Sequence, residues 1–359
     1  MPAVGAALAI ALILLLPLLG AAAAGKPLAQ YLQFPPKTPD IPHAPFSLPV
    51  FVGLSVFILA ATVPLYFRLL RRREDPPPCR PARPYPWWGW AGAAFGAAAW
   101  IVAWNRFPWM GELQAHTFTP LWISFILAAN GLLHRRTGRS LLLHRTRRFL
   151  LLFPASAAFW WSFEYLNRFV GNWRYVGGRE FGATEYFLFA TLPFSTVLPA
   201  VLTVRELLLS WPRLDAAYRS LRPFSPRRPR GVAAAALLFS CAGLLAVGAA
   251  PGIVFPLVWV APPLLLFASA GLRGEPHALS GIARGDLRPL VASTLAALLC
   301  GFFWEMWNAG SAVKWVYDIP YVDGFRLFEM PLLGYAGYLP FGVLCAEIGD
   351  RILGTGTVK

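Results

Sequence analysis

Charged residues are scarce in this chain. Asp, Glu, Lys and Arg make up 14% of its 359 residues, whereas hydrophobic residues make up 57%. Soluble domains carry about a quarter charged residues, so this shortage excludes an ordinary soluble protein. The mean hydropathy of +0.53 points the same way. We therefore predict a polytopic integral membrane protein built from apolar helices.

Acidic residues are scarcer still, because 17 Asp and Glu stand against 32 Lys and Arg and leave a net charge of +15. Such an excess can indicate nucleic-acid binding. Here the basic residues lie in short clusters between apolar runs, which is typical of the cytoplasmic loops of membrane proteins. We therefore exclude nucleic acid and expect membrane lipids as partners. The sequence carries no signal for an oligomeric state.

Cysteine is also rare. The chain has four, at Cys79, Cys241, Cys300 and Cys345, and none of them forms a C-x-x-C pair. This spacing argues against a disulfide framework and against a structural zinc site. Three of the four lie in apolar runs, where a lone cysteine packs as a small hydrophobic residue.

Several catalytic and nucleotide-binding motifs are missing. The sequence has no P-loop, no dinucleotide fingerprint and no G-x-S-x-G, which argues against ATP-driven transport and serine hydrolysis. His43 and His116 could join Glu164 and Glu305 as metal ligands. The H-x-x-x-H and H-x-x-E-H spacings of metal sites are absent, however. We therefore expect no metal and no other cofactor.

Ten apolar runs approach the length of about 20 residues that crosses a bilayer. They lie at 4–24, 47–67, 87–104, 117–133, 149–168, 185–208, 232–250, 252–272, 289–308 and 328–348. The first run could be a signal peptide, because "GAAAAG" offers small residues for cleavage. Its start, "MPAVGA", lacks the basic residues of a signal peptide. We therefore expect residues 1–24 to form an uncleaved signal anchor.

Basic loops alternate with lightly charged loops between these runs. The basic segments read "RLLRRRED", "HRRTGRSLLLHRTRR", "RSLRPFSPRRPRG" and "RGEPHALSGIARGDLRP". All four fall on one side of the membrane if the ten runs are spans, and Lys and Arg mark the cytoplasmic side. We therefore expect a multi-pass protein of the cell inner (plasma) membrane with a cytoplasmic C-terminus.

An internal repeat runs through most of the chain. Its equivalent residues recur in the same order at nearly constant spacing: Glu164 and Glu305, Asn167 and Asn308, Trp173 and Trp315, Tyr175 and Tyr317, Glu185 and Glu329, Pro199 and Pro340, and Glu206 and Glu347. Each unit, 85–208 and 232–348, holds four apolar runs. Because four is even, the two units have the same orientation, and we expect a pseudo-two-fold axis along the membrane normal.

The segments outside the repeat complete the predicted architecture. Residues 1–73 form an N-terminal addition of two spans, residues 209–231 form a basic cytoplasmic linker, and residues 349–359 form a cytoplasmic tail. We therefore predict an all-α transmembrane helix bundle of about ten spans that contains a parallel repeat of about four spans.

Acidic residues inside apolar runs are the strongest functional signal, because an ionised side chain is costly in a bilayer. Residues three apart share a helix face, so Glu164 points the same way as Asn167. The two-fold would bring four carboxylates and two amides to one cavity near the extracytoplasmic face. Loops that carry Trp and Tyr would cover this cavity. We expect the catalytic residues to be Glu164, Glu305, Glu185 and Glu329, and the substrate-binding residues to be Asn167, Asn308, Trp173, Tyr175, Trp315 and Tyr317.

A structural explanation of the same residues stays open. Trp and Tyr anchor proteins at bilayer interfaces, and a Glu in the first turn of a helix stabilises its N-terminus. This accounts for Glu185 and Glu329. Glu164 and Glu305 lie near helix C-termini, where negative charge is disfavoured. A buried ion pair or an amide-bonded network could hold them, and the nearby basic residues are Arg168, Arg174, Lys314 and Arg326.

One stretch of each unit resembles a known family. In "WRYVGGREFGATEYFLF" (173–189) and "WVYDIPYVDGFRLFEMPLL" (315–333), a W-x-Y and a spacer precede an acid that opens an aromatic-rich run. This pattern resembles the small membrane-embedded lycopene cyclases of the carotenoid pathway, which carry a P-x-E-E motif followed by F-L-F-F, consist of repeated membrane segments and need no metal. The resemblance implies that Glu185 and Glu329 protonate a polyene or another isoprenoid double bond.

The resemblance covers only these two stretches and departs from the family motif within them. Tyr186 and Met330 take the place of the second acid, and the proline is displaced or missing. In its other features the chain resembles bacterial multi-pass membrane proteins in general.

Three functions fit the sequence. The first is an enzyme that acts on a lipid or isoprenoid by carboxylate acid–base chemistry, with a cationic intermediate stabilised by some of the 15 Trp, 27 Phe and 11 Tyr rings. The second is a proton-coupled transporter of a small solute, and the third is a non-catalytic membrane assembly subunit. A transporter needs acids near mid-membrane, whereas an enzyme needs one apolar pocket beside its acids. We favour the enzyme because the acids cluster at one face.

Overall fold

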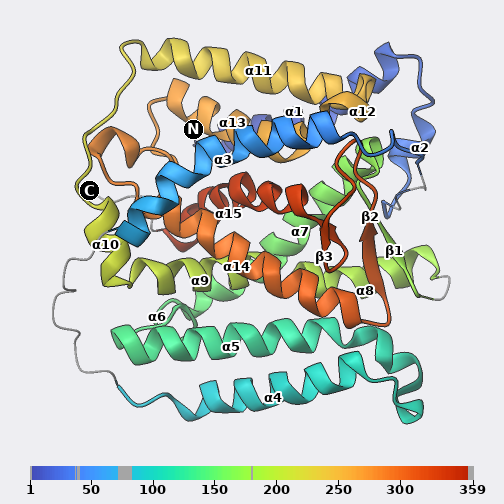
Figure 1. The fold of residues 1–359 in the computed structure, drawn as a ribbon, viewed down its shortest axis with the longest axis vertical. Coiled ribbons are helices and arrows are strands. Elements are labelled where there is room, and N and C mark those ends of the chain that lie inside the picture. The colour runs from blue at the N-terminus through green and yellow to red at the C-terminus, as the bar shows by residue number, and fades with distance from the viewer. Residues whose placement is uncertain (1, 37, 39–40, 72–82, 179–180, 355–359) are drawn as a thin grey trace.

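The computed structural model describes residues 2–36, 38, 41–71, 83–178 and 181–354 (Figure 1). Helices make up 73% of the described residues, and the only strands among these residues form two short two-stranded ribbons. The predicted all-α class is therefore confirmed as a mostly helical fold. Cys79 and residues 355–359 of the predicted tail lie outside the described residues.

The elements follow the apolar runs of the sequence. The helices are α1 Pro2–Ala23, α2 Ala29–Leu32, α3 Leu48–Arg71, α4 Trp87–Trp104, η1 Pro108–His116, α5 Phe118–Thr137, α6 Leu141–His144, α7 Thr146–Val170, α8 Ala183–Phe194, α9 Val197–Leu209, α10 Pro212–Tyr218, α11 Pro229–Ala249, α12 Pro251–Val254, α13 Leu257–Leu272, η2 Ile282–Arg284, α14 Arg288–Gly310, η3 Leu332–Gly337 and α15 Tyr338–Leu353. The strands are β1 Trp173–Val176, β2 Lys314–Tyr317, β3 Arg326–Leu327 and β4 Met330–Pro331.

Helices of membrane-spanning length are fewer than the ten runs predicted. Six helical segments within the described residues are long and apolar enough to cross a bilayer, and they lie at Leu48–Arg71, Thr146–Val170, Ala183–Leu209, Pro229–Ala249, Arg288–Gly310 and Leu332–Leu353. A seventh is formed by η1 and α5 if this pair, bent by 65°, counts as one span. Two further apolar helical segments are shorter than this length. They are Ala7–Ala23 of α1 and Leu257–Leu272, which is the whole of α13 and has 16 residues. A helix lies at each predicted run, but the count of ten spans stays a prediction.

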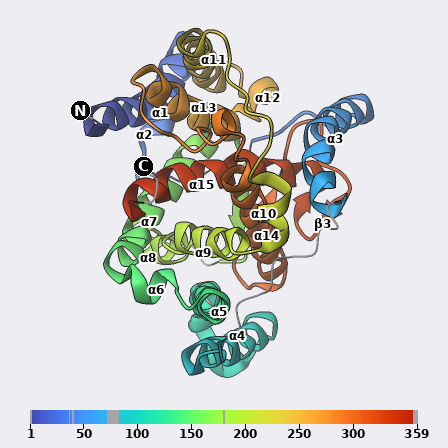
Figure 2. The same cartoon turned by 90° about the vertical axis from the view of Figure 1, so that its left-hand side faces the viewer.

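The long helices lie side by side in one bundle (Figures 1 and 2). The pair α4 and α5 lies at one end of the long axis, and the pair α11 and α13 lies at the other end, next to α1. Between these pairs stand α7, α9, α14 and α15. Each outer pair packs on the central helices in a similar way: α5 of one pair contacts α9, and α13 of the other pair contacts α15.

The basic loops meet at one end of the helices. The Arg145 and Arg148 guanidinium groups donate to the carbonyl of Leu353, at 2.5 and 2.6 Å. The backbone N–H of Leu287 donates to the carbonyl of Tyr218, which joins the linker to the loop before α14. We call this end the basic end. These contacts join the linker to the loop before α14 and the start of α7 to the end of α15, while the placing of all four basic loops on one side of a membrane stays a prediction.

The opposite end carries the ribbon of β1 and β2, and we call it the ribbon end. The two strands are antiparallel and come from sequence segments about 140 residues apart. We expected loops at both positions, so the loop assignment was wrong for residues 173–176 and 314–317. Their alternating aromatic residues suit a pleated strand better than a helix, and each strand supplies the backbone partner that the other lacks.

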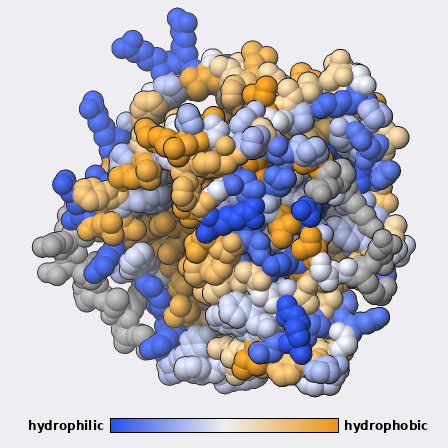
Figure 3. Space-filling view, turned by 45° about the vertical axis from the view of Figure 1, so that its right-hand side comes forward, coloured by the Kyte–Doolittle hydropathy of each residue, from blue (hydrophilic) through white to orange (hydrophobic). Residues whose placement is uncertain are grey.

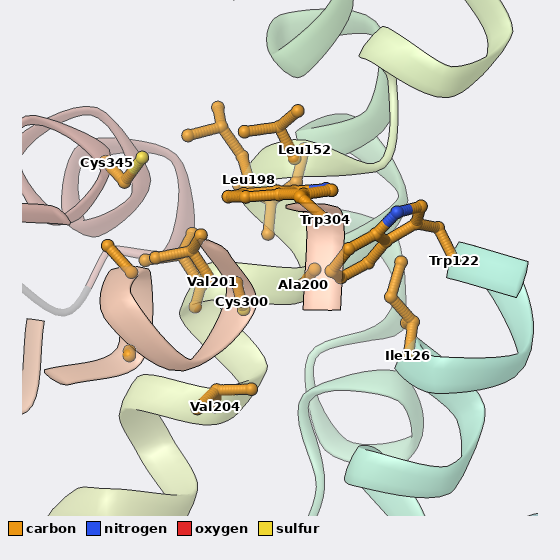
Figure 4. Packing of buried hydrophobic residues seen from close by; sticks show 14 of the residues in the cluster. Trp122, Ile126, Leu152, Leu198, Ala200, Val201, Val204, Cys300, Trp304 and Cys345 are labelled. Carbon is orange, nitrogen blue, oxygen red and sulfur yellow. The ribbon is translucent and has the colours of Figure 1, made fainter. Parts of the chain in front are cut away.

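The largest buried cluster lies between the two sides of the bundle (Figure 4). Trp122 of α5 packs against Trp304 of α14 with ring centroids 4.8 Å apart. Leu198 and Val201 of α9 belong to the same cluster and are fully buried. The segments 85–208 and 232–348 therefore share one core, and we refer to them below as the first half and the second half.

The surface is rich in exposed apolar side chains, and Figure 3 shows hydrophobic areas beside clusters of hydrophilic residues. The helix α3 contains no buried residue, although it is one of the segments apolar enough to cross a bilayer. Soluble monomers rarely expose apolar areas of this size, whereas lipid chains cover such surfaces without cost. These features are compatible with an integral membrane protein.

The N-terminal helix α1 packs closely on α11. A Cβ atom at Gly248 would lie 1.9 Å from the carbonyl oxygen of Pro17, so glycine allows the two backbones to approach. Close approach through small residues is a common way for membrane helices to associate. The expected anchor at residues 1–24 therefore forms part of the bundle in this structure.

Candidate functional site

Glu164 lies two turns before the C-terminus of α7 and is 1% exposed. Its Oε1 atom accepts three hydrogen bonds from aromatic side chains. The indole N–H groups of Trp160 and Trp173 donate at 3.0 and 3.1 Å, and the Tyr175 hydroxyl donates at 2.7 Å. The carboxyl group is therefore held by its own helix and by strand β1.

Glu305 occupies the corresponding place on α14 and is fully buried. Its Oε1 atom accepts hydrogen bonds from the hydroxyls of Tyr317 and Tyr338, both at 2.7 Å. The indole N–H of Trp315 donates to the Tyr317 hydroxyl at 2.8 Å and also interacts with Glu305. Both acids are thus shielded by aromatic residues of the following strand.

The ribbon positions these aromatic residues. Side chains two residues apart in a strand point to the same face, so Trp173 and Tyr175 lie together, as do Trp315 and Tyr317. In the register of the ribbon, Trp173 lies opposite Tyr317 and Tyr175 lies opposite Trp315. The pairing therefore brings the four aromatic side chains of the predicted site together on one face, over both acids.

The two predicted amides fix each strand to the helix before it. The Asn167 amide donates to the Trp173 carbonyl at 2.7 Å, and its oxygen accepts from the Trp173 backbone N–H at 3.3 Å. Asn308 makes the same two bonds to Trp315, at 2.7 and 2.9 Å. The amides are therefore engaged with the backbone of the strands, and their predicted contact with a substrate stays a prediction.

The other two predicted acids lie farther from the ribbon aromatics. Glu185 stands in the first turn of α8, as its spacing predicts. Glu329 lies in the turn between β3 and β4, and the next helical turn begins only at Leu332. The expectation that Glu329 opens a helix is therefore wrong. Three residues with positive φ in this segment, Tyr321, Phe325 and Phe328, keep the chain out of a helical conformation.

Three of the four basic residues considered as ion-pair partners of the buried acids make other contacts. Lys314 of β2 pairs with Glu329 at 2.5 Å. Arg326 pairs with Asp323. Arg168 is 2% exposed, and its guanidinium donates to the backbone carbonyls of Gln30 and Pro35. Within the described residues, Glu164 and Glu305 are held by neutral donors.

The two halves differ in one hydrogen-bond donor to the buried acid. Trp160 stands one turn before Glu164, and Gly301 takes the equivalent place one turn before Glu305. A Cβ atom at Gly301 would lie 2.5 Å from the Tyr338 ring. The missing side chain therefore leaves the space in which Tyr338, from α15, reaches the acid that an indole reaches in the first half.

An aromatic cavity of about 120 Å³ lies beside the acids. It is lined from both halves by Trp160, Trp173, Tyr175, Trp259, Trp304, Trp315, Tyr317 and Tyr338, with His116, Phe118, Phe189, Phe194 and Val313 among the others. A second cavity of about 250 Å³ shares Tyr175, Phe189, Pro193, Phe194 and Val313 with the first. The two cavities are therefore neighbours with a shared wall of side chains, and both linings are mainly apolar.

The ribbon tyrosines keep their protons over a wide range of pH. Burial raises the pKa of Tyr175 well above its ordinary value, and the nearby Glu164 raises it further. Burial and Glu305 raise the pKa of Tyr317 in the same way. Both hydroxyls therefore remain neutral and can pass a proton between the acid behind them and a group in the cavity.

Sequence reasoning missed several residues of this site. Trp160 precedes Glu164 by four residues, so helical spacing alone could have placed it beside the acid. Tyr338 and Trp259 come from other helices, and no local pattern marks them as neighbours of the acids, whereas His116 was considered only as a metal ligand. No cluster of three or more His, Cys, Asp or Glu residues within the described ranges could hold a metal ion. Of the two histidines considered as metal ligands, His43 lies 3.2 Å from the Gly171 carbonyl oxygen and His116 packs against the Phe189 ring.

Comparison of the chain with protein-family models, curated proteins and solved structures gives no match. The resemblance of residues 173–189 and 315–333 to lycopene cyclases therefore gains no support from these comparisons. What the site can do must be argued from its own geometry.

Proposed function

We propose that the protein is an integral membrane enzyme that binds an apolar part of a lipid or isoprenoid in the aromatic cavity and acts on it by acid–base chemistry. The observation that carries this proposal is a set of three hydroxyls. Tyr175, Tyr317 and Tyr338 each line the cavity and each donate a hydrogen bond to a buried carboxyl group. A single tyrosine hydroxyl would thus stand between a group bound in the cavity and a buried carboxyl group.

The chemistry follows from this relay. A carboxyl group passes its proton to a tyrosine hydroxyl, while that hydroxyl passes its own proton to a double bond of the bound group. The resulting cation is stabilised by the faces of the surrounding rings. It then loses a proton from a neighbouring carbon to the second acid through a second tyrosine. One proton is gained and one is lost, so the net reaction is an isomerisation or cyclisation that needs no oxidant or reductant.

A pseudo-two-fold arrangement supports the proposal that both acids serve one site. Under the predicted repeat, Trp173 is equivalent to Trp315 and Tyr175 to Tyr317. In the ribbon, Trp173 lies opposite Tyr317 and Tyr175 lies opposite Trp315, while Arg174 lies opposite its own equivalent, Val316. A two-fold axis through the Arg174–Val316 pair gives this register. Duplication of a four-span unit, with ten spans in all, is the simplest origin of such a pairing.

The position of the acids favours an enzyme over the transporter alternative. Glu164 and Glu305 lie in the half of their helices that is next to the ribbon end, and neither is exposed to solvent. A proton-coupled transporter needs acids that water reaches from both sides. We also propose that the basic end faces the cytoplasm of a plasma membrane, together with the C-terminus, because arginine-rich loops are retained on that side.

Binding of an apolar group can be tested with a substitution that fills the cavity. Val313 lines both cavities, so the larger side chain of Val313→Trp takes up space in them. Val316→Trp is the matched control, because Val316 stands in β2 but lines neither cavity. The probe is a conjugated polyene fatty acid whose fluorescence rises in an apolar site. We expect saturable binding to the wild type and to Val316→Trp, and its loss in Val313→Trp. Equal binding by all three proteins would refute the cavity as the binding site.

A further inference from the structure

The two buried acids have different hydrogen-bond donors although they occupy equivalent places. Glu164 receives two indole N–H groups and one hydroxyl, whereas Glu305 receives two hydroxyls. An indole N–H can only donate, while a hydroxyl can donate or accept. Three donated hydrogen bonds favour the ionised form of Glu164, whereas a hydroxyl beside Glu305 can also accept a hydrogen bond from a protonated carboxyl group.

The second carboxyl oxygen of Glu305 adds an independent observation. This Oε2 atom is buried and has no hydrogen-bond partner among the described protein atoms. An ionised carboxylate shares its charge between both oxygens, so ionisation would leave charge on an oxygen in apolar surroundings. A proton on Oε2 removes that charge and leaves Oε1 as the carbonyl oxygen that accepts from Tyr317 and Tyr338.

The other ionisable groups near each acid agree with this difference. Glu329 interacts electrostatically with Glu305, and it is itself paired with Lys314. A second carboxylate at this place disfavours an additional negative charge. Tyr335 also faces Glu305, and Tyr186 faces Glu164. Both are neutral hydroxyls. The nearest cation along α7, Arg168, is turned toward backbone carbonyls.

We propose that Glu305 holds its carboxyl proton at neutral pH while Glu164 is ionised, so the equivalent acids have opposite roles. Glu305 supplies the proton through Tyr338 or Tyr317, and Glu164 accepts one through Tyr175. This division of roles rests on the proposed function, whereas the difference in protonation does not. After one turnover a proton has moved from the second half to the first, and it returns to Glu305 before the next.

Infrared spectroscopy of the purified, ligand-free protein in detergent tests the difference in protonation. A buried protonated carboxyl group gives a carbonyl band above the amide I band, and an ionised one gives none there. We expect one such band in the wild type, its loss in Glu305→Gln and its retention in Glu164→Gln. Glu347→Gln is the control, because Glu347 is also buried but is held by the Arg351 guanidinium, so the band stays unchanged.

The inference is overturned if the wild type shows no band, or if the band is lost in Glu164→Gln and kept in Glu305→Gln. If Glu305→Gln fails to fold, the same infrared measurement is made on Tyr338→Phe, which leaves Glu305 in place. Loss of one hydrogen bond to the carbonyl oxygen then moves the band to higher frequency, and an unmoved band contradicts the assignment. Since no lipid is present, the measurement succeeds or fails independently of the polyene-binding test of the proposed function.

Discussion

Gly301 of α14 lies directly against the ring of Tyr338 of α15, because a Cβ atom at this glycine would be 2.5 Å from the Tyr338 Cε2 atom. The contact links two helices of the second half at the level of the buried acid. Glycine here has a packing role that is specific to this half, since the equivalent position in the first half carries Trp160.

Gly301→Ala should therefore displace Tyr338 and weaken its hydrogen bond to Glu305. Overpacking of this kind costs about 1–3 kcal/mol, so we expect a clearly lower apparent midpoint of thermal unfolding in detergent. Gly53→Ala is the control, because Gly53 also lies in a helix, α3, and no described atom outside its own stretch of backbone lies within 4 Å of the position that its Cβ atom would take. The unfolding midpoint should fall in Gly301→Ala and rise slightly in Gly53→Ala, because alanine favours a helix more than glycine does. An equal shift of the midpoint in both variants would contradict the close contact at Gly301.

The basic end holds a largely buried ion pair between α9 and α15. The Arg205 guanidinium of α9 makes two hydrogen bonds to the Asp350 carboxylate of α15, at 2.7 and 2.9 Å. Asp350→Ala should destabilise the fold by about 3 kcal/mol, the lower end of the cost of breaking a buried pair, because Glu206 stays 3.8 Å from Arg205. Thermal unfolding at a fixed scan rate measures the change.

The exposed pair of Arg326 and Asp323 provides the comparison for this prediction. Asp323→Ala should cost less than about 1 kcal/mol, because water screens a partly exposed pair. Replacing both partners of the buried pair, as Arg205→Met with Asp350→Leu, should recover most of the lost stability. A double variant no more stable than Asp350→Ala would show that the pair itself is not the cause.

Tyr317 should remain protonated in the folded protein well above the pH at which an ordinary tyrosine ionises. Its pKa is raised by burial first and by Glu305 second. The folded state thus keeps the proton longer than the unfolded state. The stability linked to this group is complete below a pH of about 10 and is lost as pH rises through the raised pKa. The same sign holds for Tyr175.

Ultraviolet titration of phenolate measures this directly. About one pH unit above the ordinary tyrosine pKa near 10, folded wild type and folded Tyr317→Phe should contain the same number of phenolates. In denaturant, the variant should contain one phenolate fewer. A difference of one in the folded state would mean that Tyr317 is accessible to water and would remove it from the proposed proton relay.

Much of the helical architecture could be predicted because it depends on local composition. A run such as 149–168 is apolar enough to form a helix wherever it lies, and its structure, Thr146–Val170, differs only at the ends. The pairing of Glu164 with Asn167 on one helix face follows from their spacing of three residues. Repetition of that spacing at Glu305 and Asn308 identified both acids without any knowledge of the fold.

Contacts between distant segments could not be predicted in this way. The pairing of Trp173 with Tyr317 joins residues that share no local pattern, so the two strands were expected to be loops. Tyr338 reaches Glu305 only because Gly301 leaves space for it, which depends on two helices at once. Glu329 was placed in a helix because apolar residues follow it, whereas positive φ angles at Phe325 and Phe328 turn the chain into a hairpin.

The most direct test of the account is the lipid extract of cells that produce the protein or its variants at equal levels. The comparison needs the wild type, Glu164→Gln, Glu305→Gln and the control Glu347→Gln, analysed by liquid chromatography and mass spectrometry. We predict an isomerised or cyclised apolar product in the wild type and in the control, and its absence from cells with either glutamine at positions 164 or 305. Identical extracts from all four strains would contradict the proposal that these acids act on a lipid or isoprenoid.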